Sequence, residues 1–163
     1  MFLCVNTLEQ GHLGEVSALE WLASHGARVA VPFGPSPDWD LIAELDGKLL
    51  RVQVKTSRCF HKERWVVAVC TRGGNQSWSG LVKRMSASRC DYLFAHVDDG
   101  RRWFIPSERV GGGNAILVGG PKYAEFEVER GRPLHQEDGC PRPLYNRPRL
   151  ARGDVRVVKG IRL

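Results

Sequence analysis

The feature that most limits the possible folds of this chain is a pair of strand-like segments, residues 40–45 and 49–56, separated by Asp46-Gly47. Asp-Gly is a preferred dipeptide for the tight turn of a hairpin, because that turn needs positive φ angles at both central positions. The sequence therefore predicts that the two segments pair as a β-hairpin. Such a hairpin fixes the relative position of every side chain along residues 40–56.

Several polar side chains are expected at the open end of this hairpin. Residues i and i+2 of a strand share a face, so Gln53 and Lys55 point one way while Val52 and Val54 point the other. Asp40 opens the preceding strand and is expected near Gln53 and Lys55. A carboxylate, an amide oxygen and an ammonium group suit the holding of a divalent cation against a phosphate. These residue types indicate phosphodiester cleavage.

A helix is expected before the hairpin, over residues 11–25, with Gly26 as its C-terminal stop. At 100° per residue, one apolar stripe is predicted, formed by Leu13, Val16, Leu19, Leu22 and Ala23. Glu15 falls inside this stripe, and Trp21 lies on the otherwise polar face. An unpaired buried carboxylate costs several kcal/mol or becomes protonated, so Lys55 or a bound cation is expected beside Glu15. The alternative is a stripe edge where Glu15 reaches water.

The rest of the chain predicts further strands, at residues 27–33, 64–71, 92–97, 102–105, 115–118 and 123–129. Residues 81–88 are expected to form a short helix or no regular structure, and a helix starting at Pro106 is expected to end at the glycines 111–113. This order of elements indicates an α/β (α+β) fold.

The excess positive charge lies in the C-terminal segment. The net charge is +6, and residues 130–163 hold nine Lys and Arg against three acids, so residues 1–129 are balanced. Prolines are also concentrated there, which favours an extended arm. We therefore expect one folded domain over residues 1–129 and a basic, proline-rich arm over 130–163 that follows a phosphate backbone. The alternatives are a solvated tail or an oligomerisation arm.

Length and composition exclude several classes of protein. A chain of 163 residues fits one domain, and it contains neither an apolar run long enough to span a bilayer nor a signal peptide. Its five cysteines include no CxxC pair, so neither a disulfide framework nor a zinc site is indicated. We expect a cytoplasmic protein without a membrane partner, and its glycine pattern is too short for a nucleotide-binding loop.

Five short motifs occur in a characteristic order: Gly11-His-Leu-Gly-Glu15, Trp39-Asp-Leu-Ile42, Arg51-Val-Gln-Val-Lys-Thr56, Asp91-Tyr-Leu-Phe94 and Trp103-Phe-Ile-Pro106. This order resembles the PD-(D/E)XK nuclease superfamily, and most closely the group I intron homing endonucleases and their bacterial relatives. The resemblance covers residues 10–106. It implies a restriction-endonuclease-like core, with the N-terminal helix packed on a mixed central β-sheet.

The resemblance also implies roles for individual residues. Asp40 and the backbone carbonyl of Val54 would ligate a divalent metal. The implied metal is Mg²⁺, with Mn²⁺ as a substitute. Lys55 would stabilise charge on the phosphate or orient water, Gln53 would position metal water or substrate, and Glu15 would complete the acidic cluster. The related enzymes carry Gln where the superfamily name has Asp or Glu, so Gln53 is compatible with activity. Asp38 is a rival ligand on the same strand face, but the apolar strand begins directly after Asp40, which favours Asp40.

The implied substrate is double-stranded DNA, cut at a specific site by a homodimer or homotetramer, since one active centre cuts one strand. The expected DNA contacts are basic residues, namely Arg51, Lys62, Arg64, Lys83, Arg84, Arg147, Arg149 and Arg152. Two alternatives stay open: a Holliday junction resolvase-like nuclease with the same core, and a non-catalytic module that binds DNA or protein.

Overall fold

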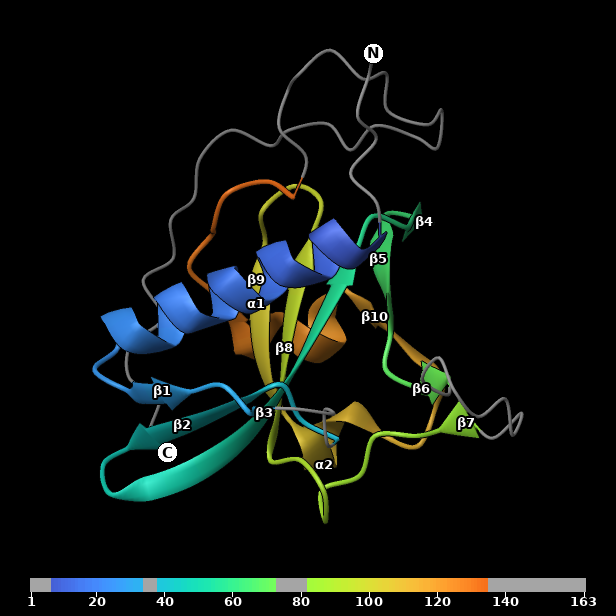
Figure 1. The fold of residues 1–163 in the computed structure, drawn as a ribbon. Helices are drawn as coiled ribbons and strands as arrows, with labels where there is room; N and C mark the ends of the chain where they lie inside the picture. The colour runs from blue at the N-terminus through green and yellow to red at the C-terminus, as the bar shows by residue number, and fades with distance from the viewer. Residues whose placement is uncertain (1–6, 34–37, 73–81, 135–163) are drawn as a thin grey trace.

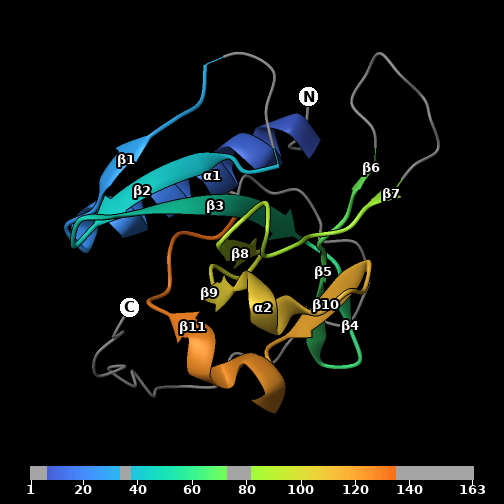
Figure 2. The same cartoon turned by 90° about the horizontal axis from the view of Figure 1, so that it is seen from below.

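In the computed structural model of the protein, the described residues are 7–33, 38–72 and 82–134. They form three layers, in which helix α1 covers one face of a six-stranded sheet and a three-stranded sheet packs on the other face (Figure 1). The view from below separates α1 from the smaller sheet, with β8 and β9 between them (Figure 2). The predicted N-terminal helix on a mixed central sheet is therefore confirmed.

The central sheet has the strand order β1-β2-β3-β8-β9-β11. Its strands are β1 (Arg28–Ala30), β2 (Leu41–Leu45), β3 (Lys48–Ser57), β8 (Tyr92–Val97), β9 (Arg102–Pro106) and β11 (Glu127–Val128). Only β3 and β8 run parallel, and the other neighbours are antiparallel. The parallel pair lies in the middle of the sheet, where both of its faces are covered.

The hairpin predicted from Asp46-Gly47 is β2–β3. Leu41 pairs with Val52, and the turn residues Asp46 and Gly47 have φ angles of 50° and 75°. Positive φ at both positions matches the tight turn that the Asp-Gly dipeptide favours. The register of the hairpin therefore follows directly from its turn.

Helix α1 (Thr7–Ser24) begins four residues before the predicted start, and it buries a different face. The predicted stripe is wrong, since Leu13, Val16 and Leu19 are 43%, 65% and 40% exposed. The buried face instead combines two small residues, Gly14 and Ala18, with Trp21 and Leu22, of which only Leu22 belongs to the predicted stripe. The helix lies so close to β3 that a Cβ at position 14 would overlap the methyl group of Thr56. The close approach of the helix to the strand requires small residues at the contact, and a search for hydrophobic periodicity does not detect such residues.

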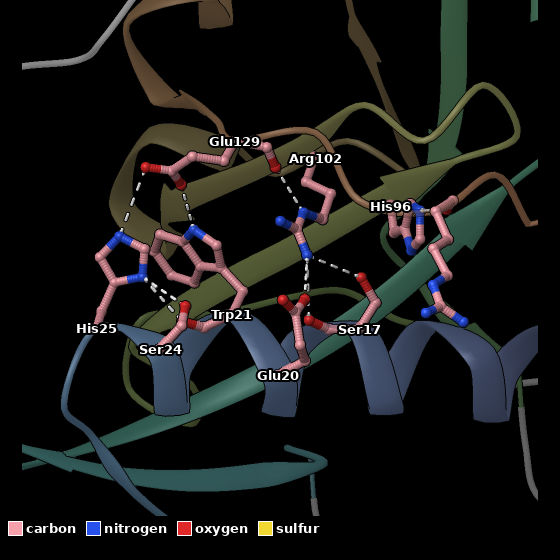
Figure 3. Close-up of polar contacts among 9 residues, drawn as sticks. Ser17, Glu20, Trp21, Ser24, His25, His96, Arg102 and Glu129 are labelled. Atoms are coloured by element: carbon pink, nitrogen blue, oxygen red, sulfur yellow. Dashed lines mark hydrogen bonds and ion pairs between the residues drawn. The ribbon is translucent and has the colours of Figure 1, made fainter.

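Polar contacts from the segment after β11 fasten α1 to the sheet (Figure 3). Trp21 Nε1 donates to a Glu129 carboxylate oxygen at 2.6 Å, and His25 Nε2 lies 3.6 Å from the other oxygen. Arg102 of β9 is 3% exposed and donates to the Glu129 carbonyl at 2.6 Å and to Glu20 at 2.7 Å. These bonds hold α1 in one position over the sheet.

The second layer of strands is the sheet β10-β5-β4, formed by β10 (Ala115–Val118), β5 (Arg64–Ala68) and β4 (Phe60–His61). Helix α2 (Ser107–Val110), the 3-10 helix η1 (Pro121–Phe126) and the pair β6 (Thr71–Arg72) and β7 (Val82–Lys83) complete the described elements. Side chains of β8 alternate between the layers: Leu93 and Ala95 face the smaller sheet, whereas Phe94 faces α1.

Several other sequence expectations differ from the structure: the strand expected over residues 64–71 ends at Ala68, and the segment 81–88 includes β7. Residues 123–129 were expected to form a strand, but Pro121 starts η1, which buries Tyr123, and only Glu127–Val128 pairs with β9. The strand expected over residues 27–33 is limited to β1, because Pro32 has no N–H for a sheet ladder.

Residues 130–134, assigned to the arm, pack on the β8–β9 turn. The Gly131 N–H donates to the Gly100 carbonyl at 2.8 Å, and Leu134 is 2% exposed. The rest of the arm, residues 135–163, lies outside the described residues. None of the described helices combines the length and the apolarity needed to cross a bilayer.

Candidate active site

Asp40 stands where β2 begins beside β3, and its carboxylate is held by two donors. Its own N–H donates to the Val52 carbonyl at 2.8 Å, which starts the pairing of the strands. Its Oδ2 accepts from Gln53 Nε2 at 2.8 Å and from the Val54 N–H at 2.7 Å. The structure therefore brings Asp40 and Gln53 together. The fixed orientation preorganises the carboxylate for binding a ligand.

Glu15 is half-buried on α1, and its carboxylate is close enough to Asp40 to feel its charge. Burial first, and then the negative charge of Asp40, raise the pKa of Glu15 above its ordinary value, while His12 has the opposite effect. Two carboxylates that repel each other in a partly buried place favour a proton or a cation between them. Glu15 thus reaches the site from the edge of the buried face of α1.

Lys55 lies two residues after Gln53, on the same face of β3 and half-buried. In the register of the parallel pair it stands opposite Ala95, a small residue that leaves room for the long side chain. Within the described part of the chain, the Lys55 side chain makes no hydrogen bond or ion pair. Its ammonium group has not been committed to a structural contact.

Asp38 has different surroundings from Asp40. Its Oδ2 lies 3.3 Å from Arg89 Nη1, and both side chains line a small hollow that Gln53 also lines. Of the two acids, Asp40 is the one bonded to the Gln53 side chain. The contacts therefore favour Asp40 over Asp38 as the acid of the site.

The donor set fits a divalent metal ion whose coordination substrate and water would complete. Across residues 7–33, 38–72 and 82–134, no three His, Cys, Asp or Glu side chains form a ready metal cluster. Asp40 and Glu15 offer carboxylate oxygens, and Gln53 offers an amide oxygen. Magnesium in phosphate-processing enzymes commonly uses one or two protein carboxylates with waters and substrate phosphates. Two mutually repelling carboxylates match that sparse pattern.

Arg51, expected to contact DNA, is engaged within the protein. Its Nη2 and Nε donate to the two carboxylate oxygens of Asp91 at 2.8 and 3.1 Å, and its Nη1 donates to the Ser88 carbonyl at 3.0 Å. These bonds hold the pKa of the Asp91 carboxyl below its usual value. Arg51 therefore ties the segment before β8 to β3.

The other basic residues expected to contact DNA are dispersed. Lys62 is exposed in the β4–β5 turn, where its φ is 48°, Arg64 is exposed at the start of β5, and Arg84 is exposed after β7. Lys83 is in β7. Arg147, Arg149 and Arg152 lie outside the described residues. Of these residues, Arg84 lines the small hollow that Gln53 also lines, and none of the others that the structure describes contacts Asp40 or Gln53.

Comparisons with known proteins agree with this fold. A family model described as PD-(D/E)XK endonuclease matches residues 5–125. Among solved structures, the chain is similar to a bacterial homing endonuclease, I-Ssp6803I, with a TM-score of 0.64 and 20% sequence identity, over 75% of this chain and 88% of that chain. No curated protein matches. The restriction-endonuclease-like core is confirmed, and the protein belongs to the PD-(D/E)XK endonuclease family.

Proposed function

We propose that the protein is a metal-dependent, site-specific endonuclease that hydrolyses phosphodiester bonds in double-stranded DNA. The observation that carries this proposal is the Asp40 carboxylate, held by Gln53 and the Val54 N–H with Glu15 beside it. Family membership supports nuclease chemistry. The likeness to a homing endonuclease supports a specific duplex target.

Magnesium, or manganese in its place, would be held by Asp40, Glu15 and the Val54 carbonyl, and would neutralise phosphate oxygens and lower the pKa of bound water. Gln53 keeps Asp40 in one orientation through its amide N–H. Because Gln53 carries no charge, the site has one negative charge fewer than a site with a carboxylate there. Lys55 offers an ammonium group that stabilises charge on the phosphate or orients the attacking water.

We infer that the active form is a homodimer or homotetramer, because one centre cuts one strand and a symmetric assembly cuts both. A two-fold assembly makes the target partly palindromic. We also place the protein in the cytoplasm. The cysteines of its described part, Cys59, Cys70 and Cys90, are free thiols, as in a reducing compartment.

Cleavage of a randomised duplex library, run beside a four-way junction, tests this proposal. With Mg²⁺ or Mn²⁺ we expect one pseudo-palindromic site to be cut, and we expect Asp40→Ala or Lys55→Ala to abolish cutting while DNA affinity stays within about threefold. Lys48→Ala is the matched control, since Lys48 is an exposed lysine at the start of the same strand.

The other outcomes of that experiment point elsewhere. Cutting of the junction alone makes the protein a resolvase-like nuclease. DNA binding by the wild type without any metal-dependent cutting makes it a non-catalytic module, and full activity of both site variants refutes the residue assignment.

A further inference from the structure

We propose that Arg89, together with Arg84, forms a second phosphate-binding subsite next to the Asp40 cluster, which holds a DNA phosphate adjacent to the one that is cut. This proposal rests on the proposed nuclease function and deepens it, because Arg84 is one of the expected DNA contacts and Arg89 is a substrate contact that the sequence did not predict. Arg89 is the central residue, and Arg51 positions it without touching DNA.

The subsite is the small hollow beside Gln53. Arg84, Ser86 and Arg89 line it together with Asp38 and Gln53. Gln53 donates to Asp40, so one side chain separates the hollow from the metal-binding carboxylate. Successive phosphates of a strand follow at about 3.4 Å of axial rise. Because Gln53 both lines the hollow and contacts Asp40, we expect a strand bound at Asp40 to have a neighbouring phosphate within reach of the hollow.

Arg89 is placed to meet that phosphate. Its side chain is 43% exposed, its Nη1 lies 3.3 Å from Asp38 Oδ2, and its Nη2 donates to the Arg84 carbonyl at 3.1 Å. The contact with the carbonyl orients the guanidinium plane. Phosphate oxygens accept the paired N–H groups of a guanidinium well, so they compete with the single oxygen of Asp38.

The segment that carries Arg84 and Arg89 is held at a fixed distance from the catalytic strand. Arg51 of β3 pairs with both carboxylate oxygens of Asp91, and the Arg51 N–H also donates to Asp91 at 2.7 Å. Cys90 is 1% exposed and its Sγ donates to the Arg51 carbonyl. The segment is therefore a rigid extension of β3, as a preorganised binding site requires.

Asp38 gives the proposal a test with effects of opposite sign. If Asp38 shields Arg89 until DNA arrives, Asp38→Asn removes a competitor and strengthens binding by about two- to fivefold, the range of an exposed ion pair. Arg89→Gln removes one phosphate contact and reduces the slope of log affinity against log salt by about 0.9. Arg89→Lys keeps the charge and most of the slope.

The experiment measures binding of the full chain to a random-sequence duplex, across salt concentrations and without divalent metal. The matched controls are Arg28→Gln and Glu44→Gln, because Arg28 and Glu44 form another exposed ion pair, at 3.5 Å, far along the sheet on β1 and β2. Both controls are expected to leave the slope unchanged. Circular dichroism melts establish that each variant is folded. If Arg89→Gln does not fold, the DNA affinity of Asp38→Asn alone tests the subsite.

The outcomes separate this inference from the proposed function. The subsite proposal is overturned by an unchanged salt slope for folded Arg89→Gln, or by unchanged or weaker DNA binding for Asp38→Asn. In either case, cutting by the wild type in Mg²⁺ still supports the proposed nuclease function. A wild type that does not bind duplex DNA overturns both proposals. Loss of metal-dependent cutting by Asp38→Asn without tighter binding makes Asp38 a metal ligand and also overturns the subsite.

Discussion

His96 of β8 is a histidine that the folded protein keeps uncharged. It is 2% exposed, its Nε2 donates to the Arg132 carbonyl at 2.9 Å, and its Nδ1 has no hydrogen-bond partner in the described structure. Burial, with a smaller contribution from the charge of Arg102, lowers the pKa of His96 from 6.5 to about 4. Protonation of this ring therefore opposes folding.

We predict that the protein loses stability as the pH falls from about 6.5 to about 4, because only the unfolded chain takes up the proton in that window. A downward shift of this size corresponds to a loss of order 3 kcal/mol. Urea unfolding at several pH values should show a smaller loss for His96→Gln. His61→Gln, at an exposed histidine of β4, should behave like the wild type. Equal losses for His96→Gln and the wild type would contradict this assignment.

The residues of the site differ in how far the sequence could predict them. Asp40 and Gln53 lie at one hairpin, so the period of a strand and one Asp-Gly turn were enough to predict their contact, with Lys55 on the same strand face as Gln53. Arg89 depends on the pairing of Arg51 with Asp91, 40 residues away, and no local pattern encodes it. Contacts within an element could be predicted, and contacts between distant segments could not.

Among the elements, α1 shows how close packing can override hydrophobic pattern. Its most apolar face is exposed at Val16, while Gly14 and Ala18 lie against the sheet. The sequence predicted the helix correctly but not its rotation, because glycine adds nothing to a hydrophobic stripe even where the backbone must come close. That rotation brings Glu15, the neighbour of Gly14, to the edge that faces Asp40.

Substitution of Gly14 tests this arrangement. Gly14→Ala should cost about 1–3 kcal/mol, because its Cβ meets the Thr56 methyl group, and should lower cleavage by moving Glu15. Adding Thr56→Ser removes the methyl group and keeps the hydroxyl oxygen that accepts a hydrogen bond from the Gln10 side chain. The double variant should therefore regain much of the lost stability and of the lost cleavage rate. Gly11→Ala, where a Cβ meets nothing within 4 Å, should be neutral or stabilising. Urea unfolding and cleavage rates measure these effects, and equal results at positions 11 and 14 would exclude the packing explanation.

At the scale of the whole molecule, charge is distributed unevenly along the sequence. Leu134 is buried on the β8–β9 turn, and seven Lys and Arg come after it in the sequence. Such a distribution adds electrostatic attraction for a polyanion to a body whose first 129 residues are balanced in charge.

If residues 135–163 bind phosphates, truncation after Leu134 should flatten the salt dependence of DNA binding by about 0.9 for each lost contact. The triple variant of Arg147, Arg149 and Arg152 to Gln, in the full chain, should produce part of the same change. The truncated protein keeps Leu134 and should melt like the wild type. A folded truncation with an unaltered slope would instead assign the arm a structural role, which sedimentation analysis of the oligomer would reveal.

The parallel pairing of β3 with β8 also affects how this protein can evolve. The chain leaves the central sheet after Ser57 and returns at Tyr92, which begins the neighbouring strand β8. Residues 58–91 are therefore an excursion, a connection between two adjacent strands of the sheet. Loop closure depends weakly on length, at about 0.6 kcal/mol for each doubling. The exposed β4–β5 turn can therefore lengthen or diverge while β2 and β3 keep their geometry. Sequence changes on this excursion can therefore accumulate without rebuilding the hairpin that holds Asp40 beside Gln53.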